Sequence, residues 1–311
     1  MKQGGRGISP KKNYKVKRGN IEEMKKTTML RRLLASGQIL VAPGAHDVMS
    51  AKIIEQVGFN AVYMTGYGAS ATILGQPDVG LLTLNEMVAQ AKNMAAAVDI
   101  PVIADADTGY GNVINVQRTI REYEQAGVAC VQLEDQVAPK RCGHMLGRQV
   151  VPTKEMVAKI RAAVEARQDP DLMIMARTDA RTNHGIEEAI KRGRAYEEAG
   201  ADILFIESPE NEEEMRLIGS SFGVPVLANM IEKGRTPLKT TQDLQELGYD
   251  LVIWPLSSLY VTAKAVKGLM LELKEKGTTA HLLADMISFN EFNELIGLPQ
   301  IGKLQERYKT V

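Results

Sequence analysis

The chain has 311 residues, and its 38 Lys and Arg balance its 38 Asp and Glu, so the formal net charge is zero. This balance excludes a bulk attraction to nucleic acid or to an anionic membrane, and we expect a small-molecule substrate. Two cysteines are too few for a disulfide framework and no apolar run reaches the roughly 18 residues of a membrane span, which together favour the cytoplasm.

The segment 1–28 is rich in Lys, Arg and Gly and shows no apolar periodicity. It lacks the apolar stretch of a targeting signal and carries Glu22 and Glu23. We therefore expect a basic, flexible tail. Residues 29–311 are expected to form a single domain.

Short apolar runs rich in Val and Ile alternate with stretches of helical periodicity from Gln38 onward. The runs predict eight strands: Ile39–Ala42, Ala61–Thr65, Val102–Asp107, Cys130–Glu134, Met173–Arg177, Ile203–Glu207, Val226–Asn229 and Leu251–Trp254.

The intervening segments are amphipathic, and several end in a residue pair typical of a helix stop, such as Ala126-Gly127, Ala199-Gly200 and Leu247-Gly248. Apolar strands separated by helices predict a parallel sheet covered all round, and eight such units close into a (β/α)8 barrel of the TIM type. An open, doubly wound α/β sheet is the alternative. The first strand is followed by Pro43-Gly44-Ala45-His46-Asp47 and not by a glycine-rich dinucleotide fingerprint.

The chain continues after the eighth strand through two further helical segments, Val261–Lys276 and Leu282–Leu295. One barrel unit does not need this much helix. We expect a C-terminal helical arm that packs on a neighbouring subunit, and hence an oligomer.

Acidic residues end three successive predicted strands: Asp105 and Asp107, then Glu134 and Asp135, then Asp179. Strand periodicity would place Asp105 and Asp107 on one face, pointing to the barrel mouth. Glu207 and Asn229 end the next two strands. A single acid there more often caps a helix, but several converging acids repel each other unless a cation lies among them. Oxygen ligands favour Mg²⁺ or Mn²⁺, and the scattered His residues disfavour zinc.

A second group of polar residues follows the fourth predicted strand, in the segment 139–148. Its cysteine, Cys142, is flanked by Lys140, Arg141 and His144, a positive field that lowers a thiol pKa and suits proton transfer. Gly143 and Gly147 would allow this loop to move as a lid. The alternative is a basic surface loop with an incidental cysteine. Cys130, inside an apolar strand, is expected to be an inert core residue.

The second predicted strand carries Tyr63 and Thr65 on one face and runs into a glycine-rich turn that contains Gly66 and Tyr67. Backbone N–H groups and a hydroxyl in such a turn can bind a carboxylate.

Three runs together carry a specific resemblance: Leu74-Gly75-Gln76-Pro77-Asp78, Asp105-Ala106-Asp107 and Lys140-Arg141-Cys142-Gly143-His144. With them, the chain from about Leu33 to Leu298 resembles the isocitrate lyase and phosphoenolpyruvate mutase superfamily. Within it, the resemblance is strongest to the small lyases that act on methylisocitrate and dimethylmalate. Mutase members lack the Cys-Gly-His sequence, so its presence here favours a lyase.

The resemblance implies a helix-swapped barrel, a homotetramer, and Mg²⁺-dependent cleavage of a C–C bond in a 2-hydroxy dicarboxylate. By position, Asp107 would be the main metal ligand, with Asp105 and Glu134 assisting. Cys142 would be the catalytic acid, helped by Lys140 and His144, and Tyr63 is a candidate base. The implied substrate-binding residues are Thr65, Gly66, Tyr67, Asp78, Gly143, Arg177, Glu207 and Asn229.

Two other activities remain open. The same site could hydrolyse or decarboxylate oxaloacetate, or the barrel could bind a dicarboxylate as a sensor without turnover, although the retained Asp105, Asp107 and Cys142 argue against a sensor. In methylisocitrate lyases an Arg after the eighth strand pairs with the third carboxylate of the substrate, whereas this chain has Tyr260 there. We therefore expect dicarboxylates to be preferred over tricarboxylates.

Overall fold

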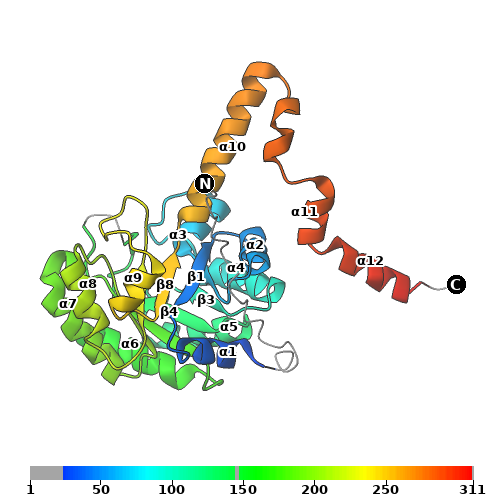
Figure 1. Cartoon of the computed structure of the whole chain (residues 1–311). Helices are drawn as coiled ribbons and strands as arrows, with labels where there is room; N and C mark the ends of the chain where they lie inside the picture. The colour runs from blue at the N-terminus through cyan, green and yellow to red at the C-terminus, as the bar shows by residue number, and fades with distance from the viewer. Residues whose placement is uncertain (1–23, 144–146, 310–311) are drawn as a thin grey trace, which may run out of the picture.

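The computed structural model describes residues 24–143 and 147–309. Within this part, eight parallel strands pair in chain order and close into a barrel (Figure 1). The strands are β1 Leu40–Ala45, β2 Val62–Met64, β3 Val102–Asp105, β4 Cys130–Glu134, β5 Met173–Thr178, β6 Ile203–Ile206, β7 Val226–Asn229 and β8 Leu251–Trp254. The predicted α/β barrel is confirmed. The open sheet is wrong, because β1 pairs with β8.

Helices cover the outside of the barrel between successive strands: α2 Val48–Val57, α4 Leu84–Ala97, α5 Val113–Gln125, α6 Thr153–Ala166, α7 Arg181–Glu198, α8 Glu212–Gly219 and α9 Thr241–Glu246. The predicted stops are confirmed at Gly127, Gly200 and Gly248, whose φ angles are +84°, +100° and +93°. A glycine adopts this left-handed conformation without the steric cost that a side chain adds. Each helix therefore ends where the chain must turn into the next strand.

Helix α1, Lys26–Leu34, closes the barrel at the N-terminal ends of the strands. Leu30 and Leu34 are buried in the cluster of apolar residues that fills this end. The tail expected over residues 1–28 extends too far at its C-terminal end, because α1 begins at Lys26 and buries Thr27. An apolar face only two turns long gave too weak a periodicity to reveal it. Residues 1–23 of the expected tail lie outside the described residues.

A helical arm follows β8, as expected, and points away from the barrel (Figure 1). Its elements are α10 Ser257–Lys276, η3 Ala280–Asp285, α11 Phe289–Leu295 and α12 Leu298–Arg307. The single helix expected over 282–295 is wrong, because Met286 is extended and Ser288 starts a new helix by accepting a hydrogen bond from the Glu291 N–H. No helix of the described residues is long and apolar enough to cross a membrane.

The inside of the barrel changes character along its axis. Toward the N-terminal ends of the strands it is apolar and contains Ile103, Met175 and the fully buried Cys130, whose thiol pKa is raised by burial. Toward the C-terminal ends, buried polar side chains such as Gln132 and Glu134 take over. Active sites of this fold lie at the C-terminal end, so the polar end is the candidate site.

Candidate active site

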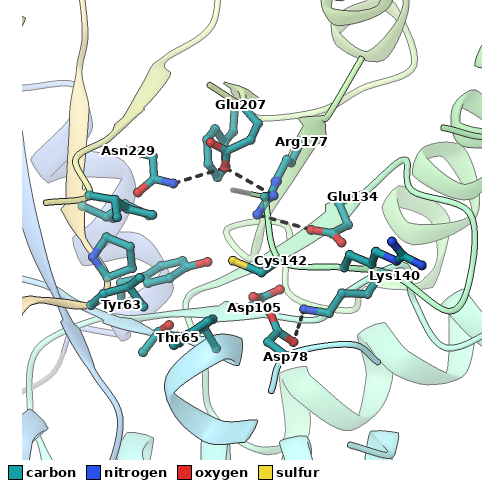
Figure 2. A pocket seen from close by; sticks show the side chains of 18 residues that line it. Tyr63, Thr65, Asp78, Asp105, Glu134, Lys140, Cys142, Arg177, Glu207 and Asn229 are labelled. Carbon is teal, nitrogen blue, oxygen red and sulfur yellow. Dashed lines mark hydrogen bonds and ion pairs between the residues drawn. The ribbon is translucent and has the colours of Figure 1, made fainter. Parts of the chain in front are cut away.

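A cavity opens at the C-terminal ends of the strands (Figure 2). It brings together twelve of the fifteen residues predicted from the sequence: Tyr63, Thr65, Tyr67, Asp78, Asp105, Glu134, Lys140, Cys142, Gly143, Arg177, Glu207 and Asn229. Gly66 and Asp107 do not line it, and His144 lies outside the described residues. The segment 144–146 is likewise outside them, so the lid stays a prediction.

Asp105 and Asp107 do not share one face of a strand, as the sequence analysis expected. Strand β3 ends at Asp105, and Asp107 has a left-handed backbone with φ +48°, so strand alternation does not extend to it. The Asp107 N–H donates to Asp105 Oδ1 over 3.0 Å. Asp105 lines the cavity, whereas Asp107 directs its carboxylate to Lys140 beside it.

Lys140 is held between two buried carboxylates. Its Nζ lies 2.6 Å from Asp78 Oδ1 and 2.7 Å from Asp107 Oδ1. Burial lowers the pKa of Lys140, but the charges of Asp107, Glu134 and Asp78 outweigh it and hold the pKa well above its ordinary value. Lys140 is therefore a fixed positive charge at neutral pH, and this disfavours a role as proton donor.

Arg177, at the end of β5, is the second fixed cation. Its Nε and Nη2 donate to the two oxygens of Asp179 over 3.0 and 2.9 Å. The guanidinium also lies 3.3 Å from both Glu134 Oε2 and Glu207 Oε2 (Figure 2). It lies 5.0 Å above the Phe205 ring. Burial lowers the pKa of Arg177 and the three carboxylates raise it, with a net rise well above its ordinary value. A planar guanidinium so oriented can bind a substrate carboxylate.

Cys142 and Gly143 approach the cavity from the segment after β4. The Cys142 N–H donates to the Asp78 carbonyl over 3.1 Å. A Cβ atom on Gly143 would lie 2.3 Å from Arg177 Nη2 and 2.8 Å from Glu207 Oε2, so only glycine fits against this pair. Ser208 Oγ donates to the Gly143 carbonyl over 3.3 Å. These contacts place the thiol-bearing segment directly against Arg177 and Glu207.

Tyr63 donates its hydroxyl hydrogen to Gln132 Oε1 over 3.0 Å. Burial, followed by the charge of Asp105, raises the pKa of this phenol well above its ordinary value. A neutral phenol whose proton is already donated is a poor base. The structure therefore favours an orienting role for Tyr63 over the general-base role named in the sequence analysis.

The turn after β2 forms the short helix α3, Gly66–Ala69, which continues into η2, Ser70–Leu74. Thr65 caps α3, since its Oγ1 accepts the Gly68 N–H over 3.3 Å. A Cβ on Gly66 would lie 2.5 Å from Asp105 Oδ2, so glycine allows this turn to approach the acid closely. Thr65 and Tyr67 thereby reach the cavity.

The sequence analysis missed an apolar wall of the cavity, formed by Phe205, Ile231, Ile253, Pro255 and Leu256. One signal was available for Phe205, because it stands two residues before Glu207 in the predicted strand Ile203–Glu207, where strand alternation would place both on one face. The others belong to β8 and to segments after β7 and β8, whose apolar residues are indistinguishable from core residues in sequence. They make one side of the cavity suitable for an alkyl group.

The acidic side shows an excess of negative charge. Burial raises the pKa of Asp107 to about 6 and that of Glu134 well above its ordinary value, despite the opposing charges of Lys140 and Arg177. Among the described residues, Glu134 Oε1 has no hydrogen-bond partner. No three His, Cys, Asp or Glu side chains in this part of the chain are placed to ligate one ion directly. The residues fit an ion held by few carboxylates with water in its shell, as is usual for Mg²⁺.

Comparison with known proteins agrees with this geometry. The family model of phosphoenolpyruvate phosphomutase matches residues 30–274. The chain belongs to the phosphoenolpyruvate mutase/isocitrate lyase superfamily. It is 58% identical to the 2,3-dimethylmalate lyase of Eubacterium barkeri over 92% of this chain and 99% of the relative. It is 46% identical to the petal death protein of Dianthus caryophyllus over 92% and 90%. A 2-methylisocitrate lyase of Aeropyrum pernix is 44% identical over 86% of each chain.

Solved structures of the superfamily share the fold. A crystal structure of 2,3-dimethylmalate lyase has a TM-score of 0.87 at 40% identity and covers 91% of this chain and 95% of its own. Oxaloacetate acetylhydrolase in complex with 3,3-difluorooxalacetate has a TM-score of 0.87 at 34% identity, covering 91% and 96%. Phosphonopyruvate hydrolase in complex with oxalate and Mg²⁺ has a TM-score of 0.84 at 32% identity, covering 92% and 99%.

Proposed function

We propose that the chain is a metal-dependent carbon–carbon lyase that cleaves a 2-hydroxy dicarboxylate of the 2-alkylmalate type to a 2-oxo acid and a carboxylic acid. The observation that carries this proposal is the cavity itself. It brings together buried acids, Arg177, the Cys142 side chain and apolar side chains such as Ile253 and Leu256. The 58% identity to a 2,3-dimethylmalate lyase supports the same reading.

Asp105, Asp107 and Glu134 are the residues that would hold Mg²⁺ or Mn²⁺, either directly or through water. The raised pKa values of Asp107 and Glu134 fit a site that is completed by a cation. The ion would supply positive charge that lowers the pKa of the substrate's C2 hydroxyl. Lys140 stays beside Asp107 and fixes its carboxylate.

The residues of the chain then have separate tasks. Arg177 and the turn from Thr65 to Tyr67 bind the two substrate carboxylates. The C2 hydroxyl loses its proton to solvent, which later returns a proton to the Cys142 thiolate. The C2–O bond becomes a carbonyl, and the electron pair of the broken C2–C3 bond passes to an enolised carboxylate. The Cys142 S–H delivers its proton to C3 and completes the carboxylic acid product. The apolar wall accepts the alkyl groups and keeps water from the carbanionic fragment.

The apolar side chains of the cavity also favour a dicarboxylate over a tricarboxylate substrate. Among the described residues that line the cavity, the cations are Lys140, Arg141 and Arg177, and Lys140 and Arg177 are already paired with acids. Tyr260 lies in the first turn of α10, and burial, followed by the neighbouring Tyr67, raises the pKa of its phenol. A third carboxylate would have no charged partner on the apolar side, and an unpaired buried charge costs several kcal/mol.

The decisive experiment compares 2,3-dimethylmalate with 2-methylisocitrate in the presence of Mg²⁺. We expect kcat/KM for the dicarboxylate to be higher by at least about tenfold, the factor that corresponds to 1.4 kcal/mol. Pyruvate and propionate are the products expected from 2,3-dimethylmalate. A clear preference for the tricarboxylate would contradict the assignment of the apolar wall.

Hydrolysis of oxaloacetate is the second candidate, because the fold matches that of an oxaloacetate acetylhydrolase with a TM-score of 0.87. Product analysis separates the activities. Oxalate and acetate from oxaloacetate indicate hydrolysis, whereas pyruvate and carbon dioxide indicate decarboxylation. We expect both hydrolysis and decarboxylation of oxaloacetate to be much slower than cleavage of 2,3-dimethylmalate.

The arm supports an oligomeric assembly. No residue of α10 is buried in the single chain, and Val261, Leu271, Phe289 and Ile301 are among the exposed apolar side chains of the arm. We propose that the arm packs on a second copy, with the last helix swapped, in a homotetramer. Light scattering on the purified protein measures the mass directly. Because Cys142 must remain a reduced thiol to deliver a proton, we also propose a reducing compartment, the cytoplasm.

A further inference from the structure

Asp179 lies directly after β5 with a buried side chain and does not line the cavity. It accepts two hydrogen bonds from Arg177, over 3.0 and 2.9 Å. Its own N–H donates to Asp135 Oδ1 over 3.0 Å, and this fixes the backbone that carries it. Asp179 therefore supports the substrate-binding cation from behind and cannot touch a substrate itself.

The same carboxylate also binds the chain on the C-terminal side of Cys142. Arg148 Nη1 donates to Asp179 Oδ1 over 2.5 Å, and Arg148 Nη2 donates to Thr182 Oγ1 over 2.5 Å. The Arg148 carbonyl accepts a hydrogen bond from Asn183. Arg148 is buried, so its pairing with Asp179 is largely shielded from water.

Gln136 makes the matching connection on the N-terminal side. Its side-chain amide donates to the Arg141 carbonyl over 2.8 Å and accepts the Arg141 N–H over 2.9 Å. The Gln136 side chain also lies beside the Asp179 carboxylate and helps to lower its pKa. Arg141 immediately precedes Cys142, so Asp179 is connected to the chain on both sides of the thiol.

We propose that Asp179 is a positioning residue that fixes Arg177 and the two ends of the Cys142 segment as one unit. This inference rests on the proposed lyase function, in which Arg177 binds a carboxylate and Cys142 delivers the proton. A single carboxylate bonded to both parts keeps the bound substrate and the thiol aligned. Misplacement by about 1 Å can cost about 10²-fold in rate, so such a connection has catalytic value.

Alkylation of Cys142 by iodoacetamide provides a test that does not depend on turnover. The chain has two cysteines, and Cys130 is fully buried, so alkylation of the folded protein reports Cys142. We expect Asp179→Asn to raise the alkylation rate at least about tenfold, a change equal to about 1.4 kcal/mol. With 2,3-dimethylmalate, kcat should fall and KM should rise, because the thiol and Arg177 are both displaced.

Asp202→Asn is the matched control. Asp202 also bridges two arginines, with Arg31 Nη2 at 2.8 Å and Arg167 Nη1 at 2.5 Å, but at the opposite end of the barrel. It should leave the alkylation rate and the kinetic constants near the wild-type values. An equal effect of Asp202→Asn on alkylation would mean that general loosening is responsible, and it would overturn the proposal.

Arg148→Gln tests the connection of Asp179 to the Cys142 segment separately from its connection to Arg177. It also provides a second test if Asp179→Asn does not fold. It removes the bond to the Cys142 segment and leaves Arg177 paired with Asp179. Alkylation should again accelerate and kcat should fall, with KM within about threefold of wild type. Unchanged alkylation in folded Arg148→Gln would refute the role of Asp179. A wild-type protein that cleaves none of the candidate substrates would instead refute the lyase proposal, while the alkylation rates would still decide this one.

Discussion

Replacing Gly143 by alanine tests whether the contact between the Cys142 segment and Arg177 matters for catalysis. The added Cβ would lie 2.3 Å from Arg177 Nη2 and 2.8 Å from Glu207 Oε2. Ordinary contacts between such atoms begin near 3.5 Å, so the segment or the guanidinium must move by about 1 Å. A shift of this size costs about 10²-fold in rate, and overpacking costs roughly 1–3 kcal/mol of stability.

The assay is steady-state kinetics with 2,3-dimethylmalate and Mg²⁺, with pyruvate measured by a coupled dehydrogenase, alongside thermal unfolding. Gly223→Ala is the control, because its Cβ would meet only the flexible end of the Glu197 side chain, at 3.1 Å. We expect the control to retain wild-type kcat/KM and Gly143→Ala to lose most of it while remaining folded. Activity within about threefold of wild type in folded Gly143→Ala would refute the reasoning.

Three further predictions concern the acid, the metal-side carboxylate and the phenol. Cys142→Ser should lower kcat by at least about 10²-fold with a smaller change in KM, and near-normal turnover would show that the proton comes from another group. Because burial raises the pKa of Asp107 from 3.8 to about 6, the metal-free protein gains stability from this group below its unfolded-state pKa and loses it as pH rises through about 6. Thermal melts in a chelator between about pH 4 and 8 should show this decline in wild type and a flatter curve in Asp107→Asn, and Mg²⁺ should stabilise only the wild type. Tyr63→Phe should lower kcat by about tenfold or less, since Tyr63 orients Gln132, and a loss on the scale of a missing base would restore the general-base interpretation.

The fold was accessible from sequence because its signals are local and repeated. Each apolar run lies within or overlaps an observed strand, and the glycines at 127, 200 and 248 end helices where their positive φ requires them. Helix α2 directly follows β1, with Asp47 as its cap. The eightfold alternation predicted the correct closure without the bounds of each helix, since the strand count alone sets it.

The sequence predicted which residues meet at the site. It did not predict the direction of every side chain. Strand ends converge in a barrel, so Asp105, Glu134 and Arg177 could be brought together without coordinates. The direction of the Asp107 side chain could not be predicted, because a left-handed φ on a non-glycine residue is set by tertiary contacts. Here that contact is the pairing with Lys140. The apolar wall was missed for a related reason, since apolar residues at the mouth and in the core look alike in sequence.

The two ends of the barrel differ in how far their buried charges are neutralised. At the N-terminal end, Leu30 and Leu34 of α1 seal an apolar interior, and Asp202 is neutralised by two arginines. At the C-terminal end, Asp107 and Glu134 keep raised pKa values although Lys140 and Arg177 are fixed beside them. That end is incompletely neutralised in the isolated chain, and such a site gains stability from whatever cation binds to it. A dicarboxylate then enters a cavity whose acids are already compensated and whose Arg177 is already oriented, so little reorganisation remains for the bond-breaking step.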